Sequence, residues 1–203
     1  MNIQSDFDFL IKLALLGDPT VGKTNLVIRY TENTFSLNTP PTIGYDYKSK
    51  TVDIKKTKQK AKVQIFDTAG QERYMSLSKN VYKRVDGVIL VYDITQMQTF
   101  KNISKWIELI KEFNDNLPIL LIGNKIDSDE RIVSFEEGKK FGDENKINFF
   151  ETSALSGANV EEAFESFINE IVKFLKNKNP VSSDTFSLNK EKKKSQKKKC
   201  CKK

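Results

Sequence analysis

Eight consecutive residues near the N-terminus have the types and spacing of a phosphate-binding loop, or P-loop: Gly17-Asp18-Pro19-Thr20-Val21-Gly22-Lys23-Thr24. They follow directly on an apolar run, residues 10–16, so the loop lies where a buried strand is expected to turn into a helix. The two glycines let the backbone wrap around a phosphate chain, and the N-terminal end of the following helix adds positive charge. We therefore expect Lys23 to reach the β- and γ-phosphates of a nucleotide, and the Thr24 hydroxyl to hold magnesium.

A second motif, Asn124-Lys125-Ile126-Asp127, selects the base. It comes just after the apolar run 119–122, at the end of a strand where open α/β sheets place their ligands. The Asp127 carboxylate can accept hydrogen bonds from N1–H and the 2-amino group of guanine, whereas adenine has no donor at either position. Where hydrogen bonding discriminates, the wrong base is rejected by about 10⁴-fold or more. The motif therefore predicts a guanine nucleotide.

A third motif, Asp67-Thr68-Ala69-Gly70-Gln71, follows a predicted strand that ends at Phe66. An acidic residue at this point can hold magnesium through water, and glycine lets a backbone N–H approach a γ-phosphate closely. The structural alternative is an Asp–Thr turn that caps a helix. Next to the other two motifs, the nucleotide interpretation is favoured.

Strand-like runs alternate with amphipathic helical ones, which predicts an α/β fold with a mostly parallel sheet and helices on both faces. Strands are expected at residues 9–16, 46–55, 62–66, 88–92, 119–122 and 148–151. Helices are expected at residues 23–31, 100–113, 134–145 and 160–176. The Lys-rich turn 56–60 makes the second and third strands a hairpin, so the six-stranded sheet should have one antiparallel edge strand.

Composition and the three motifs together divide the chain into a short N-terminal extension, residues 1–8, an expected GTP-binding domain, residues 9–177, and a disordered Lys-rich tail, residues 178–203. The net charge of +7 belongs to the tail: residues 189–203 hold nine lysines and one glutamate, which leaves 25 basic and 26 acidic residues elsewhere. The basic segment, residues 189–203, has no aromatic residue for base stacking, so nucleic-acid binding is not expected. With no apolar run near 18 residues and a polar start, we expect a cytosolic chain.

Together these motifs resemble those of the Ras superfamily of small GTPases, and the chain resembles the Rab family over nearly its whole length, from about residue 9 to the C-terminal cysteines. The motifs occur in family order at close to family spacing. They are the P-loop, Thr42-Ile43-Gly44, residues 67–71, residues 124–127 and Ser153-Ala154.

The resemblance implies a P-loop small GTPase fold and a switch that binds GTP and GDP with magnesium and hydrolyses GTP. It implies that Gln71 orients the attacking water, that Phe35 packs against guanine, and that Gly70 senses the γ-phosphate. The implied nucleotide-binding residues are Gly17, Thr20, Val21, Gly22, Lys23, Thr24, Asn25, Phe35, Thr42, Gly70, Asn124, Lys125, Asp127, Ser153, Ala154 and Leu155. The implied magnesium ligands are Thr24, Thr42 and Asp67.

Partners follow from the same resemblance. No Arg or Lys lies between Tyr30 and Tyr47, so an arginine finger from the first switch is absent. A GTPase-activating protein should supply it, worth roughly 10³ to 10⁵ in rate. An exchange factor and effectors are expected at the switch regions, residues 39–47 and 70–82, of a protein that is itself monomeric.

The tail ends in Cys200-Cys201-Lys202-Lys203, which resembles the twin-cysteine endings of Rab proteins that receive two geranylgeranyl groups. Two lipids suit stable membrane attachment, and the lysines add attraction to anionic lipids. This implies prenylation and membrane-extraction chaperones, and a location on the cytoplasmic face of an intracellular membrane with cycling through the cytosol. The alternative is an unmodified, solubilising Lys tail, because the ending does not fit a Cys-aliphatic-aliphatic-X box.

Several residues depart from the Rab pattern. Pro19 and Thr20 stand where relatives usually have Ser-Gly or Gly-Gly, and Pro19 has no N–H for phosphate. A GTP-binding scaffold with little hydrolysis is therefore the second hypothesis, and an ATP-dependent P-loop enzyme is the third. Leu155 replaces a lysine that can cover guanine, and Trp106 is expected in the core. The effector-facing aromatic triad of Rabs corresponds here to Tyr47, Phe66 and Val81.

Overall fold

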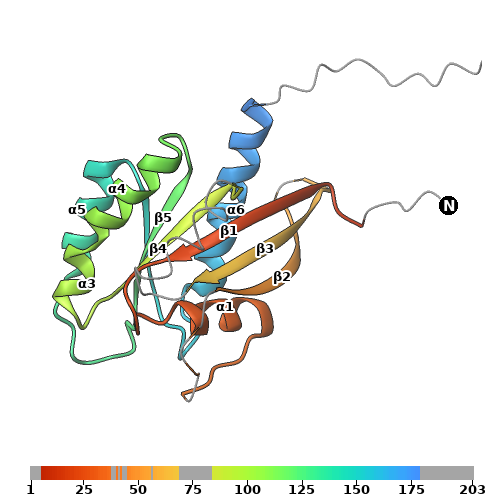
Figure 1. The fold of residues 1–203 in the computed structure, drawn as a ribbon. Coiled ribbons are helices and arrows are strands. Elements are labelled where there is room, and N and C mark those ends of the chain that lie inside the picture. The colour runs from red at the N-terminus through yellow and green to blue at the C-terminus, as the bar shows by residue number, and fades with distance from the viewer. Residues whose placement is uncertain are drawn as a thin grey trace, which may run out of the picture.

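The computed structural model describes residues 6–37, 40, 42, 45–55, 57–68 and 84–178, and shows a single sheet with helices packed around it (Figure 1). The strands are β1 Phe9–Leu16, β2 Tyr45–Asp53, β3 Lys60–Thr68, β4 Gly87–Asp93, β5 Ile119–Asn124 and β6 Asn148–Thr152. The helices are α1 Lys23–Glu32, α3 Met97–Lys101, α4 Ile103–Phe113, α5 Phe135–Asn145 and α6 Val160–Lys178.

The sheet has six strands in the order β2-β3-β1-β4-β5-β6. β2 pairs antiparallel with β3 and forms one edge, and every other pairing is parallel. The predicted fold class is confirmed. Because the five parallel strands point the same way, their carboxyl ends meet at one edge of the sheet, and this edge collects the motifs that the sequence singled out.

Side chains on β1 alternate between the two faces of the sheet, as the period of a strand requires. Ile11, Leu13 and Leu15 join the core under α1 and α6, whereas Ala14 and Leu16 join the core under α3, α4 and α5. Helices therefore cover both faces, as predicted, and β1 is buried on both sides. This central strand gives the P-loop a rigid base.

One predicted helix differs in its bounds. The expected helix 100–113 is two helices, α3 and α4, which meet at Asn102. The first of them, α3, begins at Met97, three residues before the predicted start. Asn102 has ψ −12°, flatter than the α-helical value near −42°, so the regular hydrogen-bond ladder is interrupted there. Asparagine has low helix propensity, which makes it a natural place for the interruption.

At the two ends of the chain, the described residues stop at Asp6 and Lys178. Asp8 lies beside β3: its N–H donates to the Lys60 carbonyl at 2.8 Å, and its carboxylate accepts from the Lys60 N–H at 2.8 Å. Apart from its first residue, Lys178, the predicted tail lies outside the described residues, and so do Cys200 and Cys201. Within the described part of the chain, no helix is both long and apolar enough to cross a bilayer.

Candidate functional site

The P-loop turns sharply between β1 and α1, and its glycines are required by close contacts. Gly17 has φ 142°, and a Cβ there would lie 2.1 Å from the Val91 carbonyl oxygen. Gly22 has φ 96° at the N-terminus of α1, and a Cβ there would lie 2.4 Å from Asn124 Nδ2. Thr20 adopts φ 63°, a left-handed conformation that costs a residue with a Cβ about 1 kcal/mol. The loop is therefore held in a curved, partly strained form.

The side chain of Lys23 lies inside the curved loop. It is only 6 % exposed, and Nζ donates to the carbonyl oxygens of Gly17 at 2.9 Å and Asp18 at 2.7 Å. Burial lowers the pKa of Lys23 from 10.5 to about 8, although the charges of Asp67 and Asp18 oppose this shift. An anion bound beside this ammonium would favour its charged form and offset the cost of burial.

Three side-chain oxygens converge beside Lys23. Thr24 Oγ1 lies 2.9 Å from Thr42 Oγ1 and donates to Asp67 Oδ2 at 2.6 Å, and Thr42 Oγ1 donates to the same oxygen at 3.1 Å. Burial raises the pKa of Asp67, against the opposing effects of the Thr24 hydrogen bond, Lys23 and the Thr42 hydrogen bond. Thus α1, β3 and the loop before β2 each contribute one oxygen.

This cluster fits magnesium. Mg²⁺ binds oxygens at about 2.0–2.1 Å in an octahedron, so neighbouring ligand oxygens lie about 2.9 Å apart. The three separations in the cluster, 2.6 to 3.1 Å, match that edge. In addition, Asp67 Oδ1 is buried and has no hydrogen-bond partner within the described residues, and a buried oxygen of this kind requires a cation or a donor.

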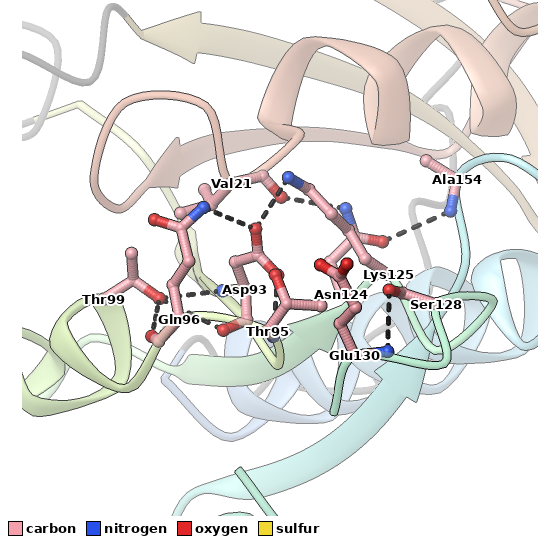
Figure 2. A network of polar contacts seen from close by, with 10 residues as sticks. All are labelled: Val21, Asp93, Thr95, Gln96, Thr99, Asn124, Lys125, Ser128, Glu130 and Ala154. Carbon is pink, nitrogen blue, oxygen red and sulfur yellow. Dashed lines mark hydrogen bonds and ion pairs between the residues drawn. The ribbon is translucent and has the colours of Figure 1, made fainter. Parts of the chain in front are cut away.

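Asn124 joins the P-loop to the two strands beside it. Its Nδ2 donates to the Val21 carbonyl at 2.9 Å, and its Oδ1 accepts from the Ala154 N–H at 3.2 Å (Figure 2). The same Oδ1 accepts from Thr152 Oγ1, also at 3.2 Å. All four groups are buried. Asn124 therefore fixes the loops that follow β1, β5 and β6 relative to one another.

Lys125 is held by a residue that sequence reasoning missed. Its Nζ lies 2.6 Å from Oδ2 of Asp93, which is fully buried at the end of β4 (Figure 2). The same carboxylate accepts from Gln96 Nε2 at 3.1 Å and from the Thr95 N–H and hydroxyl at 2.9 and 2.7 Å. Its position at the carboxyl end of a central parallel strand was the available signal.

The third loop of the site follows β6. Its first residue, buried Ser153, donates a hydrogen bond from its hydroxyl to Oδ1 of Asp127, an exposed residue of the loop after β5. Arg29 of α1, which sequence reasoning also missed, donates to the carbonyl oxygens of Ala154 at 2.9 Å and Leu155 at 2.7 Å. These bonds attach the loop to α1 and leave the Asp127 carboxylate open on the surface.

The other candidate residues lie around this centre. Asn25 is half-buried in the first turn of α1, and Phe35 is half-buried and packs against the core on the α1 side of the sheet. Leu155 is exposed. Gly70 and Gln71 lie outside the described residues, as does Val81. Of the predicted aromatic set, Tyr47 and Phe66 form a tilted ring pair with centroids 5.7 Å apart.

Comparison with known proteins agrees with this geometry. A model of the Ras family matches residues 12–173 of the chain. The GTP-binding protein ypt3 of Schizosaccharomyces pombe is 39 % identical over 183 residues, which are 89 % of this chain and 85 % of that protein. The Ras-related protein Rab-11A of Dictyostelium discoideum is 43 % identical over 170 residues, 83 % of this chain and 78 % of that protein. The Ras-related protein RABA2a of Arabidopsis thaliana is 39 % identical over 186 residues, 91 % of this chain and 84 % of that protein.

Proposed function

Because the chain belongs to the Ras family of small GTPases and is similar to Rab proteins, we propose that it is a membrane-attached switch in vesicle trafficking that binds GTP and GDP with magnesium and hydrolyses GTP. The observation that carries the proposal is the shared edge of the sheet. The P-loop with buried Lys23, the oxygen cluster of Thr24, Thr42 and Asp67, and the exposed Asp127 carboxylate all lie at the carboxyl ends of the parallel strands.

The phosphates would lie over the P-loop, with Lys23 Nζ exchanging its carbonyl partners for phosphate oxygens. Thr24, Thr42 and Asp67 would hold magnesium, which supplies positive charge against the β- and γ-phosphates. Thr20, Val21, Gly22 and Asn25 would surround the phosphates from the loop and the first turn of α1. Asp127 would bind the guanine edge, Lys125 and Phe35 would pack on its faces, and Ser153, Ala154 and Leu155 would border it.

For hydrolysis, we propose that Gln71 orients a water in line with the γ-phosphate and that the Gly70 N–H contacts that phosphate. Lys23 and backbone amides would stabilise the charge of the transition state. No Arg or Lys is available between residues 30 and 47, so the intrinsic rate should be slow, and an activating protein should supply an arginine.

Pro19 is expected to affect the intrinsic rate of GTP hydrolysis. It is exposed at the outside of the P-loop and cannot donate to a phosphate. In single-turnover assays we expect Gln71→Leu to slow GTP hydrolysis by at least about tenfold, because the water loses its orienting group, and we expect Pro19→Gly to change the rate measurably. Equal rates in wild type and both variants would remove Gln71 and Pro19 from the mechanism and favour the scaffold hypothesis.

The switch regions, residues 39–47 and 70–82, are proposed to be ordered by the γ-phosphate through Thr42 and Gly70 and released on hydrolysis. Just before the first of them, Leu37 is 85 % exposed, and Tyr47 within it is also exposed. An exchange factor, an activating protein and effectors are proposed to contact the switch regions and these two side chains.

The domain organisation is proposed as an N-terminal extension, residues 1–8, a GTP-binding domain, residues 9–177, and a tail, residues 178–203. The tail is proposed to carry lipids on Cys200 and Cys201 and to contact anionic membranes. Prenylation and membrane-extraction chaperones are proposed to bind it. The protein as a whole is proposed to be monomeric and not to bind nucleic acid.

The membrane proposal predicts a membrane-bound pattern for the tagged protein and a diffuse cytosolic pattern for a Cys200→Ser/Cys201→Ser double variant. Without lipid only the basic segment remains, and a single signal does not give stable anchoring, which takes two lipid chains or one chain plus a basic segment. The remaining electrostatic attraction is also screened by salt. Live-cell imaging of both proteins makes the comparison. A diffuse signal from both would contradict membrane attachment.

A further inference from the structure

The carboxylate of Asp18, the second residue of the P-loop, is bound from the side by two residues of the α3–α4 region. Asn102 Nδ2 donates to Asp18 Oδ2 at 2.6 Å, and Trp106 Nε1 donates to Asp18 Oδ1 at 3.0 Å. One donor therefore serves each carboxylate oxygen. These contacts join residues 84 and 88 positions apart in the chain, and we call the three residues the Asp18 bridge.

Asn102 does not cap the helix that follows it, and Trp106 makes a polar contact in addition to its packing in the core. Asn102 precedes α4, where an asparagine side chain commonly caps the helix, yet no side-chain cap bond forms there among the described residues. Its amide donates to Asp18 instead. Trp106 is only 8 % exposed and packs in the core under α3, α4 and α5, as predicted, where an all-carbon ring would fill the space without a polar atom. A buried indole N–H needs an acceptor, and Asp18 supplies it.

The bridge acts where the loop is under strain. Thr20, two residues after Asp18, is in the left-handed conformation, and at Gly17, one residue before it, the β4 backbone leaves no room for a Cβ. The main-chain carbonyl of Asp18 also accepts the hydrogen bond from Lys23 Nζ. Hydrogen bonds to the Asp18 side chain therefore also fix the Asp18 carbonyl, which positions Lys23. They do so in a loop where Thr20 adopts a backbone conformation that is unfavourable for it.

We propose that Asn102 and Trp106 are positioning residues for phosphate binding: through the Asp18 carboxylate they hold the P-loop in its binding conformation. The proposal rests on the guanine-nucleotide binding proposed above. It also makes Trp106, the single tryptophan of the chain, a built-in fluorescence reporter of the P-loop. Removal of bound nucleotide should change its emission, and loss of the Asp18 carboxylate should abolish most of that change.

The test is a double-variant cycle on the full-length protein, with the dissociation rate of radiolabelled GDP in magnesium buffer as the readout. Trp106→Phe removes one of the two bonds and should raise the rate about fivefold, and Asp18→Ala removes both and should raise it about tenfold. The double variant should match Asp18→Ala alone, because the indole has nothing left to hold. Asn102→Ala removes the other bond and should raise the rate several-fold. Because Asn102 is half-exposed, this variant can replace Trp106→Phe if that variant folds poorly.

Ile110→Val is the matched control, because Ile110 lies one turn further along α4 in the same core and does not take part in the bridge. It should lower the melting temperature and leave the GDP dissociation rate within about twofold of wild type. Two results would overturn the bridge in a wild-type protein that binds nucleotide. In the first, the rate increases of Trp106→Phe and Asp18→Ala multiply in the double variant. In the second, the GDP dissociation rates of Trp106→Phe and Asn102→Ala equal that of the control. A wild-type protein that binds no guanine nucleotide would overturn the proposed function and the bridge together.

Discussion

Replacement of Lys23 by methionine should weaken GDP and GTP binding by about 10³-fold and leave the nucleotide-free protein at least as stable as wild type. The ammonium is buried, and within the described part of the chain its hydrogen bonds go to the carbonyl oxygens of Gly17 and Asp18. Phosphate oxygens would replace both of these acceptors. Two or more charge-assisted hydrogen bonds to phosphate contribute about 1.5–3 kcal/mol each, and 1.4 kcal/mol is tenfold in affinity. Methionine keeps the length of the side chain and removes the charge that burial penalises.

The stability half of this prediction follows from the pKa of Lys23. Burial lowers it from 10.5 in the unfolded chain to about 8 in the folded one. Between these two pH values the unfolded state binds more protons, so the free energy of unfolding of the nucleotide-free protein should rise with pH. Below about pH 8 the penalty is fully present. Lys23→Met should lack the rise between pH 8 and 10.5, because it has no proton to lose.

The measurement combines GDP binding by calorimetry with denaturant unfolding of the nucleotide-free protein at pH 7 and at pH 9.5. Lys12→Met is the control, because Lys12 is a half-buried lysine of β1 outside the P-loop. That variant should bind GDP as wild type does. If Lys23→Met bound GDP within tenfold of wild type, Lys23 would not be the phosphate ligand. A marked loss of stability in the same variant would instead make the buried ammonium a structural group.

Asp127→Asn should lower guanine-nucleotide affinity by about 10²- to 10⁴-fold. The Asp127 carboxylate accepts from two guanine donors in the proposed complex, whereas asparagine would present an N–H to one of them. The folded structure should tolerate the change, since Asp127 is exposed and an amide oxygen can still accept from Ser153. The same amide could donate to the 2-oxo group of xanthine, so xanthosine diphosphate should bind the variant better than it binds wild type.

Competition of GDP and xanthosine diphosphate for both proteins measures this switch. Asp129→Asn is the matched control, because Asp129 is an exposed aspartate of the same loop. It should leave both affinities unchanged. Unaltered GDP affinity in Asp127→Asn would show that this carboxylate does not bind the base.

Much of the fold and of the site's centre could be predicted from the sequence, because short-range patterns determine them. Strand-like runs predicted all six strands, the second of them as part of a hairpin, and the parallel order placed the P-loop, Asp67 and Asn124 at one edge of the sheet. Strand ends were less predictable. β5 continues through Asn124 because its backbone remains paired with Thr152 of β6, a contact that depends on a distant part of the chain.

The supporting residues could not be predicted for the same reason. Asp93 holds Lys125, Arg29 holds the loop after β6, and Asp18 is held by Asn102 and Trp106, and each of these contacts joins segments far apart in sequence. Trp106 was correctly predicted as core from its helical spacing, but spacing carries no information about the partner of an indole N–H. Side-chain hydrogen bonds of this kind depend on how the elements pack.

The central claim, that the chain binds a guanine nucleotide, also separates it from an ATP-dependent P-loop enzyme. The direct measurement is displacement of radiolabelled GDP from the wild-type protein in magnesium buffer by unlabelled nucleotides. We predict that GDP and GTP displace the label at equimolar concentration and that ATP does not displace it at an excess of about 10³-fold. Displacement by ATP at the same concentration as GTP would contradict the claim.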